Sequence, residues 1–164
     1  MSNSFQAEHF RARRWWRLPW PILAILTLSA PASAELDGGL ASVYRDTAQV
    51  NGRVLITNAD HYTIYEIKTS TGTTLREFVS PGGTVFGIAW AGRFLPDMNQ
   101  FLGTYFDQYS AAVRAQTMKY AGRRPLEIHL SNFAFESSGH MGRYYGRAYV
   151  PQSVPKQVKA EEIR

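Results

Sequence analysis

The spacing of apolar positions changes along the chain, and each spacing predicts a different element. Over residues 95–122 apolar side chains recur every three or four positions, which predicts one long amphipathic helix. Asp97 stands at the expected N-cap, and Gln100 three residues later completes the pattern of a capping box. Gly122, followed by Pro125, supplies the expected end of this helix.

Alternating apolar residues predict strands on both sides of the helix. Residues 61–68 and 73–79 form a predicted hairpin, in which a three-residue loop ending at Gly72 places Glu66 opposite Arg76. A third strand is predicted over residues 84–90. Beyond the helix, the alternation over 126–135 changes phase near Ser131, which predicts a bulge or break. A last strand over 141–150 follows a predicted turn at 137–139.

The order of these elements is β-β-β-α-β-β and predicts an α+β fold. We expect an antiparallel sheet of about five strands with one long helix packed on one face. Residues 35–164 are expected to form a single domain with a loop-like N-terminal segment, and the short apolar run 54–56 is expected to pack onto it. A C-terminal tail should lie against the surface through Val154, Val158 and Ile163.

Residues 1–34 have the layout of a secretory signal peptide. Four arginines precede a mostly apolar stretch, residues 18–28, and Ala32-Ser33-Ala34 offers small residues for cleavage. The apolar stretch is about half of the ~20 residues that span a bilayer, so no stable membrane span is expected after cleavage. The layout predicts a periplasmic or extracellular protein. The alternative is anchoring by an uncleaved N-terminal segment.

Charge and cysteine content narrow the class of protein. The chain of 164 residues carries a net charge of +5, but the first 34 residues hold four Arg and one Glu. The remaining 130 residues carry 14 basic and 12 acidic side chains. We therefore expect no nucleic-acid partner, because such binding needs a concentrated basic surface. The chain has no cysteine, so its stability cannot depend on disulfides.

The stretch 139–149 holds the candidate binding residues. Strand alternation places one set of arginine and tyrosine side chains on a common face: Arg143, Tyr145, Arg147 and Tyr149. Guanidinium and phenol groups in alternation could stack on sugars or bind an anionic polymer. The alternative interpretation is an ordinary solvated strand face, on which both residue types are common.

His140 is the weak catalytic candidate, because histidine can act as a base, a metal ligand or a pH switch. Regular alternation places it on the face opposite Arg143 and Arg147, a placement that a bulge at Gly142 would change, and a structural histidine in a turn is the simpler interpretation. His61, His129 and His140 lack metal-ligand spacing, so no metal or other cofactor is expected. Nucleophile-elbow, zinc-protease, phosphate-loop and dinucleotide motifs are missing, which favours a non-enzymatic protein.

Several short motifs resemble those of an uncharacterised family of exported bacterial proteins, the domain of unknown function 2844. They are residues 76–81 (REFVSP), 95–97 (LPD), 139–141 (GHM), 146–149 (GRAY) and 162–164 (EIR). Ser138 stands where a glycine is common in that family. The resemblance implies a leader and a one-domain layout, and it brings no established activity.

The leading hypothesis is an exported, non-enzymatic domain that binds an envelope polymer or envelope protein through the Arg/Tyr strand face. One alternative is a hydrolase-type enzyme that uses His140. Another is an assembly factor that pairs through the edges of its sheet.

Overall fold

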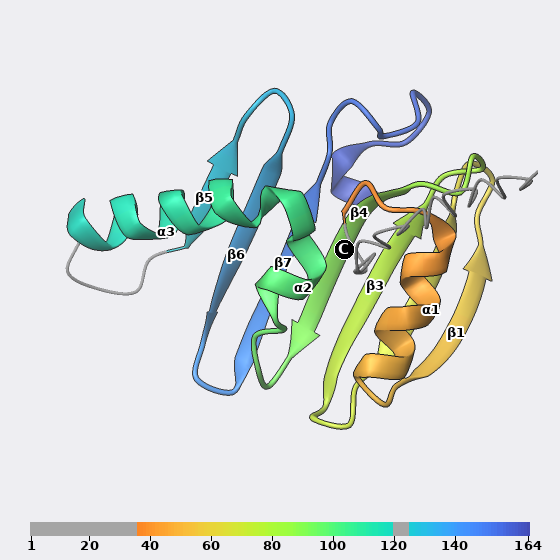
Figure 1. Ribbon diagram of the computed structural model, residues 1–164, viewed down its shortest axis with the longest axis horizontal. Coiled ribbons are helices and arrows are strands. Elements are labelled where there is room, and N and C mark those ends of the chain that lie inside the picture. Colours follow the sequence, from red (N-terminus) through yellow and green to blue (C-terminus); the bar gives the residue numbers. More distant parts are fainter. Residues whose placement is uncertain (1–35, 120–124) are drawn as a thin grey trace, which may run out of the picture.

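The computed structural model describes residues 36–119 and 125–164, which contain one seven-stranded antiparallel sheet (Figure 1). The predicted signal peptide and the predicted helix end at Gly122 lie outside the described residues. The strand order is β1-β2-β3-β4-β7-β6-β5. The bounds are β1 Arg53–Asn58, β2 Thr63–Lys68, β3 Thr73–Val79, β4 Val85–Gly92, β5 Leu126–His129, β6 Ala134–His140 and β7 Arg143–Tyr149.

Helices cover one face of this sheet, and the C-terminal segment covers part of the other. The helices are α1 (Leu40–Gln49), α2 (Met98–Leu102) and α3 (Phe106–Lys119), with the 3-10 turn η1 (Gly103–Tyr105) between the last two (Figure 1). We call their side the helix face. Residues 150–164, which include the 3-10 turn η2 (Ala160–Glu162), pack on the opposite side, the tail face. The α+β class is thereby confirmed.

The prediction of about five strands was too low. The run 54–56, expected only to pack onto the domain, belongs to β1, which pairs with β2 along its whole length. Residues 126–135 form parts of two strands, because the Leu130 N–H bonds to the Phe133 carbonyl and the chain reverses there. The phase change near Ser131 thus marks a tight connection rather than a bulge within one strand.

The predicted single helix is interrupted at Gly103. This glycine has φ 50° and ψ −120°, outside the helical region, so α2 ends and the chain restarts through η1 into α3. Asp97 is the N-cap as predicted, accepting hydrogen bonds from the backbone N–H groups of Asn99 and Gln100. Gln100 does not complete a capping box: its side chain donates to Asp46 instead.

The predicted register of the first hairpin is confirmed. Glu66 pairs with Arg76 across β2 and β3, and the Arg76 Nε donates to the Glu66 Oε2 at 2.9 Å. Gly72 has φ 84°, the left-handed conformation expected at that loop position. Charge pairing and loop geometry together were therefore enough to fix this register.

The second hairpin turns later than predicted. The predicted turn at residues 137–139 lies inside β6, and the reversal occurs at Met141 and Gly142. Gly142 has φ 82°, which suits a tight turn, and His140 pairs directly with Arg143. The sequence has glycines at both 139 and 142, so either position could have provided the turn.

The helix face holds the larger core. Tyr105 stacks on Phe133 with ring centres 5.2 Å apart, and Tyr109 packs against Phe135 at 4.8 Å. Trp90 of β4 lies beside Phe135 and directly over Gly146 of β7. A Cβ at residue 146 would come within 2.4 Å of the indole, so glycine is needed for this close approach.

The tail face holds a second, smaller core beneath the C-terminal segment. Val158 and Ile163 are buried against Phe78 and Phe86, and Val154 packs at the margin of this cluster. Ile163 is 0% exposed, and its side chain occupies the space that Gly87 leaves open on β4. The predicted contacts of the tail are therefore present.

A pair of buried carboxyl groups lies between α1 and the sheet. Glu77 of β3 and Asp46 of α1 are each 1% exposed, and the Gln100 side chain of α2 donates to the Asp46 Oδ1 at 2.6 Å. Both carboxyl oxygens of Glu77 lack a hydrogen-bond partner within the described chain, and Asp46 is near enough to influence its protonation. Burial, reinforced by Asp46, raises the pKa of Glu77 well above its ordinary 4.5.

The two outer strands differ in character. β1 has six residues and exposes Leu55 by 62% and Ile56 by 48%, whereas β5 has four residues. β1 contains no proline, one of the features that blunt sheet edges, and its one charged residue, Arg53, stands at its start. In the described ranges, no helix has the length and apolar character needed to cross a membrane.

Candidate functional site

The tail face has a groove along β4, β6 and β7 that the C-terminal segment leaves uncovered. It consists of two adjoining depressions, of about 830 Å³ beside the β6–β7 turn and about 440 Å³ beside the tail. We call these the hairpin end and the tail end. They share Ala91, Ser138 and Tyr145. Ala91 lies on the tail face of β4 where the two ends meet, and its small side chain leaves open space between them.

The hairpin end carries unpaired positive charge. Arg93, His140 and Arg143 line it together with Tyr144 and Tyr145, and no acidic residue of the described chain lines it. Arg143 is exposed and makes no hydrogen bond or ion pair with any described residue. Arg93 lies over the ring of Phe94, 5.8 Å from its centre, and is also exposed. This end is therefore suited to an anion.

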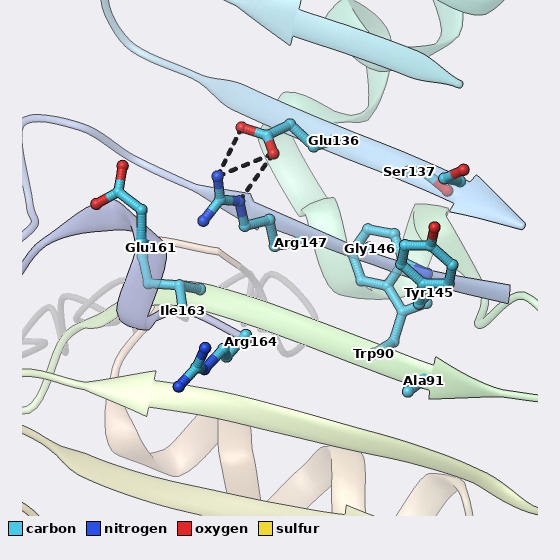
Figure 2. A pocket seen from close by; sticks show the side chains of 11 residues that line it. Trp90, Ala91, Glu136, Ser137, Tyr145, Gly146, Arg147, Glu161, Ile163 and Arg164 are labelled. Atoms are coloured by element: carbon cyan, nitrogen blue, oxygen red, sulfur yellow. Dashed lines mark hydrogen bonds and ion pairs between the residues drawn. The ribbon is translucent and has the colours of Figure 1, made fainter. Parts of the chain in front are cut away.

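The tail end is organised by one arginine that is fully engaged (Figure 2). Arg147 makes a bidentate pair of hydrogen bonds to Glu136, from Nε to Oε2 and from Nη2 to Oε1, both at 3.0 Å. Its Nη1 donates to the Ala160 carbonyl of η2 at 2.6 Å. The charge of Arg147 is thus neutralised, and its guanidinium fixes the tail to the sheet.

The remaining lining of the tail end is mostly apolar with balanced charges at its margin. Ile163 and Ala91 contribute carbon surface, and Glu161 and Arg164 lie at the margin on the tail side (Figure 2). The Arg164 carbonyl accepts a hydrogen bond from the Arg76 Nη1 at 3.0 Å, which holds the end of the tail over the sheet. The tail end therefore offers apolar surface and little net charge.

The four predicted ligand-binding residues share the tail face, but only two of them line the groove with exposed side chains. Arg143 and Tyr145 do so, and Tyr145 is 58% exposed. Arg147 lines the tail end while paired with Glu136, and Tyr149 packs at the margin of the second core. The structure thus divides the predicted face into a solvent-facing half and a half that holds the tail.

His140 lies on the same face as Arg143, and the predicted opposite placement was wrong. Because the chain reverses at Met141 and Gly142, His140 and Arg143 stand opposite each other on neighbouring strands. Ser138, two residues earlier on β6, lines the same end of the groove. His140 has no hydrogen-bond partner among the described residues, so no third group orients its imidazole as in a catalytic triad.

Metal binding has no support from the described part of the chain. No group of three or more His, Asp or Glu side chains there converges closely enough to hold an ion. His61 precedes β2, His129 ends β5 and His140 ends β6. The expectation of no cofactor stays a prediction.

Sequence reasoning missed two residues that shape the groove. Arg93 directly follows β4, which extends two residues beyond the predicted strand 84–90. Glu136 was not singled out, although the register of a hairpin turning at Met141 and Gly142 places it opposite Arg147. The charge rule that fixed the first hairpin would have found this pair.

Comparison with known proteins identifies the family and no closer relative. Neither the curated proteins nor the solved structures contain a significant match to this sequence. The family model described as "Protein of unknown function (DUF2844)" matches residues 32–163, which include the whole sheet, the helices and nearly all of the tail. The chain therefore belongs to the DUF2844 family.

Proposed function

We propose that this protein is an exported, non-enzymatic binding domain of the cell envelope that holds an anionic ligand in the tail-face groove. The observation that carries the proposal is the unpaired positive charge of the hairpin end. Arg147 and Arg76 on the same face are each engaged by a glutamate and by a tail carbonyl. Arg143 has no such partner in the described chain.

The backbone around Arg143 is held in place before any ligand arrives. Arg143, the first residue of β7, pairs with His140 of β6, and the next residue, Tyr144, pairs with β4 as well, so the sheet positions the backbone at Arg143. A guanidinium presents a planar fork of N–H donors that matches carboxylate and phosphate groups. Tyr145, two residues along the same face, adds an exposed ring against which part of a ligand can pack.

The leader-like layout of residues 1–34 supports placing this ligand in the envelope. Acidic groups are common there, on polysaccharides, on peptidoglycan fragments and on lipids. The alternative in which an uncleaved N-terminal segment anchors the protein would place the groove in the same compartment. Both arrangements are compatible with the proposed binding.

Replacing Arg143 by glutamine should lower the affinity for anionic envelope ligands about tenfold. A hydrogen bond to a charged group contributes about 1.5 kcal/mol, which corresponds to roughly that factor. Calorimetric titration with acidic polysaccharide and peptidoglycan fragments at low and moderate salt would measure the change. Arg53→Gln is the matched control, because Arg53 is exposed on the same face at the far edge of the sheet. Equal losses in both variants would indicate general charge attraction and contradict a site at Arg143.

The hydrolase alternative has less support from the geometry. Ser138 and His140 share a strand face and one end of the groove, but no hydrogen bond joins them in the structure. No acidic side chain of the described chain lines that end. A serine nucleophile needs a base that is itself oriented, and this arrangement provides neither the contact nor the orienting group.

Assembly through a sheet edge is a second candidate function, favoured by the exposed apolar residues of β1. Two copies could extend the sheet by antiparallel pairing of β1 about Ile56, which would cover Ile56 and Leu55. Leu55→Lys should then abolish self-association, whereas Met118→Lys, at an 89% exposed position on α3, should not. Sedimentation velocity over a range of concentrations tests this, and a strictly monomeric wild-type protein would contradict it.

A further inference from the structure

The two ends of the groove differ in chemistry, and this difference points to a class of ligand. Building on the proposed function, we infer that the groove binds a single-chain anionic amphiphile, such as a fatty-acid carboxylate. The head group lies at the hairpin end beside Arg143 and Arg93, and the hydrocarbon chain runs across Ala91 into the tail end.

Charge sets the direction of such a ligand. At the hairpin end two arginines face solvent with no acidic residue in the lining. At the tail end Glu136 binds the positive charge of Arg147, and Glu161 and Arg164 contribute one charge of each sign to the margin. The tail end has no net charge, so an anionic head is attracted more strongly to the first end and its chain points toward the second.

The tail end fits a hydrocarbon chain better than further sugar or phosphate units. Ile163 and Ala91 present carbon to this depression, and the Arg147 guanidinium that also lines it already donates to Glu136 and to the Ala160 carbonyl. A polar polymer would have to exchange water hydrogen bonds for carbon surface at this end. A single chain gains by covering that surface, and the depression of about 440 Å³ can take several methylene groups.

Tyr145 and Ala91 make the two ends one continuous site. Both line the hairpin end and the tail end, and they are direct cross-strand partners on β7 and β4. The side chain of Tyr145 is 58% exposed and lies beside the small side chain of Ala91. A chain that leaves the head group must pass this point, so the size of residue 91 controls access to the tail end.

A series of alkyl carboxylates tests the inference on the full chain. Acetate, hexanoate and decanoate are titrated below their micelle-forming concentrations, with decanol as the neutral counterpart of the longest acid. Each added methylene should raise the affinity roughly two- to fourfold, the factor expected for partial to full burial of a CH₂ group. Decanol should bind more weakly than decanoate by about tenfold, because it lacks the charge that Arg143 holds.

Two variants separate the head site from the chain site. Arg143→Gln should weaken every carboxylate by a similar factor and leave the gain per methylene unchanged. Ala91→Leu should reduce the gain in affinity per methylene, so that decanoate binds little more tightly than acetate, because the larger side chain blocks the passage. Thr57→Leu is the control, a similar enlargement at an exposed position on the same face of β1.

The outcomes distinguish the inference from the function on which it rests. Carboxylates that bind with an affinity independent of chain length, and with the same loss in Arg143→Gln, would overturn the amphiphile and leave the anion site standing. Failure of every carboxylate and of the acidic polymers to bind would overturn both. Equal affinity for decanol and decanoate would keep the apolar channel but remove the anionic head, which also contradicts the inference.

Discussion

Glu77→Gln should flatten the pH dependence of folding stability and make the protein more stable than wild type at neutral and alkaline pH. Glu77 is buried beneath α1 beside Asp46, and burial raises its pKa well above 4.5. Glutamine has nearly the same shape as the protonated acid and cannot ionise. The variant should therefore behave as the wild-type protein does when Glu77 holds its proton.

The direction of the change in stability with pH follows from the pH at which folded and unfolded Glu77 release the proton. Unfolded Glu77 releases its proton near pH 4.5, whereas folded Glu77 keeps it to a higher pH. Between these two values the folded state binds more protons, so the free energy of unfolding falls as pH rises. The loss is at most about 1.4 kcal/mol per pH unit for one group. Burial raises the pKa of Asp46 as well, so its contribution has the same sign.

Urea unfolding at a series of pH values from 4 to 9 would measure this slope. Glu127→Gln is the control, because Glu127 is exposed on β5 and its substitution should leave the slope as in wild type. At pH 4 the Glu77→Gln variant should match wild type within about 1 kcal/mol. A variant as pH-dependent as wild type would show that Glu77 does not hold the proton.

The second large change in folding stability is expected from a substitution in the C-terminal segment. Ile163→Ala should lower the free energy of unfolding by about 2–5 kcal/mol, the range for removing a buried isoleucine side chain from a packed site. Ile163 is 0% exposed and fills the space over Gly87, so its loss leaves a cavity that the rigid strand β4 cannot close. Such a loss is a large fraction of the stability of a typical domain.

Ile56→Ala is the matched control for this prediction. It removes the same atoms from an isoleucine that is 48% exposed at the outer strand β1, where a change within about 0.5 kcal/mol is expected. Chemical denaturation of both variants gives the comparison. If Ile163→Ala were as mild as Ile56→Ala, the tail would be loosely held, and the tail end of the groove would lose its wall.

The fold class and one hairpin register could be predicted because local rules determine them. Glu66 and Arg76 carry opposite charges, and Gly72 accepts a left-handed conformation, so only one pairing satisfied both. The outer strand β1 was missed for a physical reason. β1 is exposed at most of its positions, so it lacks the apolar alternation that marks a half-buried strand.

The interruption of the predicted helix could not be seen in the spacing of apolar residues either. Apolar spacing continues through Gly103, so the pattern alone does not reveal that the glycine leaves the helical region. The sharp change of direction lets α2 place Gln100 against Asp46 while α3 lies over β5 and β6 (Figure 1). Tertiary packing, which the sequence pattern does not report, decides between these conformations.

The sequence indicated which residues share a face at the candidate site, but it did not indicate which partners they contact. Alternation placed four residues of β7 on one face, as the structure shows: Arg143, Tyr145, Arg147 and Tyr149. It could not show that Arg147 binds Glu136 and the tail, because both partners come from other segments. The position of His140 depended on which of two glycines makes the turn, and the pattern did not distinguish them.

The strand order also determines when different parts of the sheet can form. β1 to β4 pair in sequence, and β5 to β7 do the same, so each group closes only short loops. The join between them pairs residues 87–92 with residues 144–149, across a segment that includes α2 and α3. Because closing a long loop costs entropy before any contact compensates for it, we expect this join to limit the folding rate. Until it forms, β4 and β7 are both open edges, and the nascent chain is most prone to aggregation at that stage.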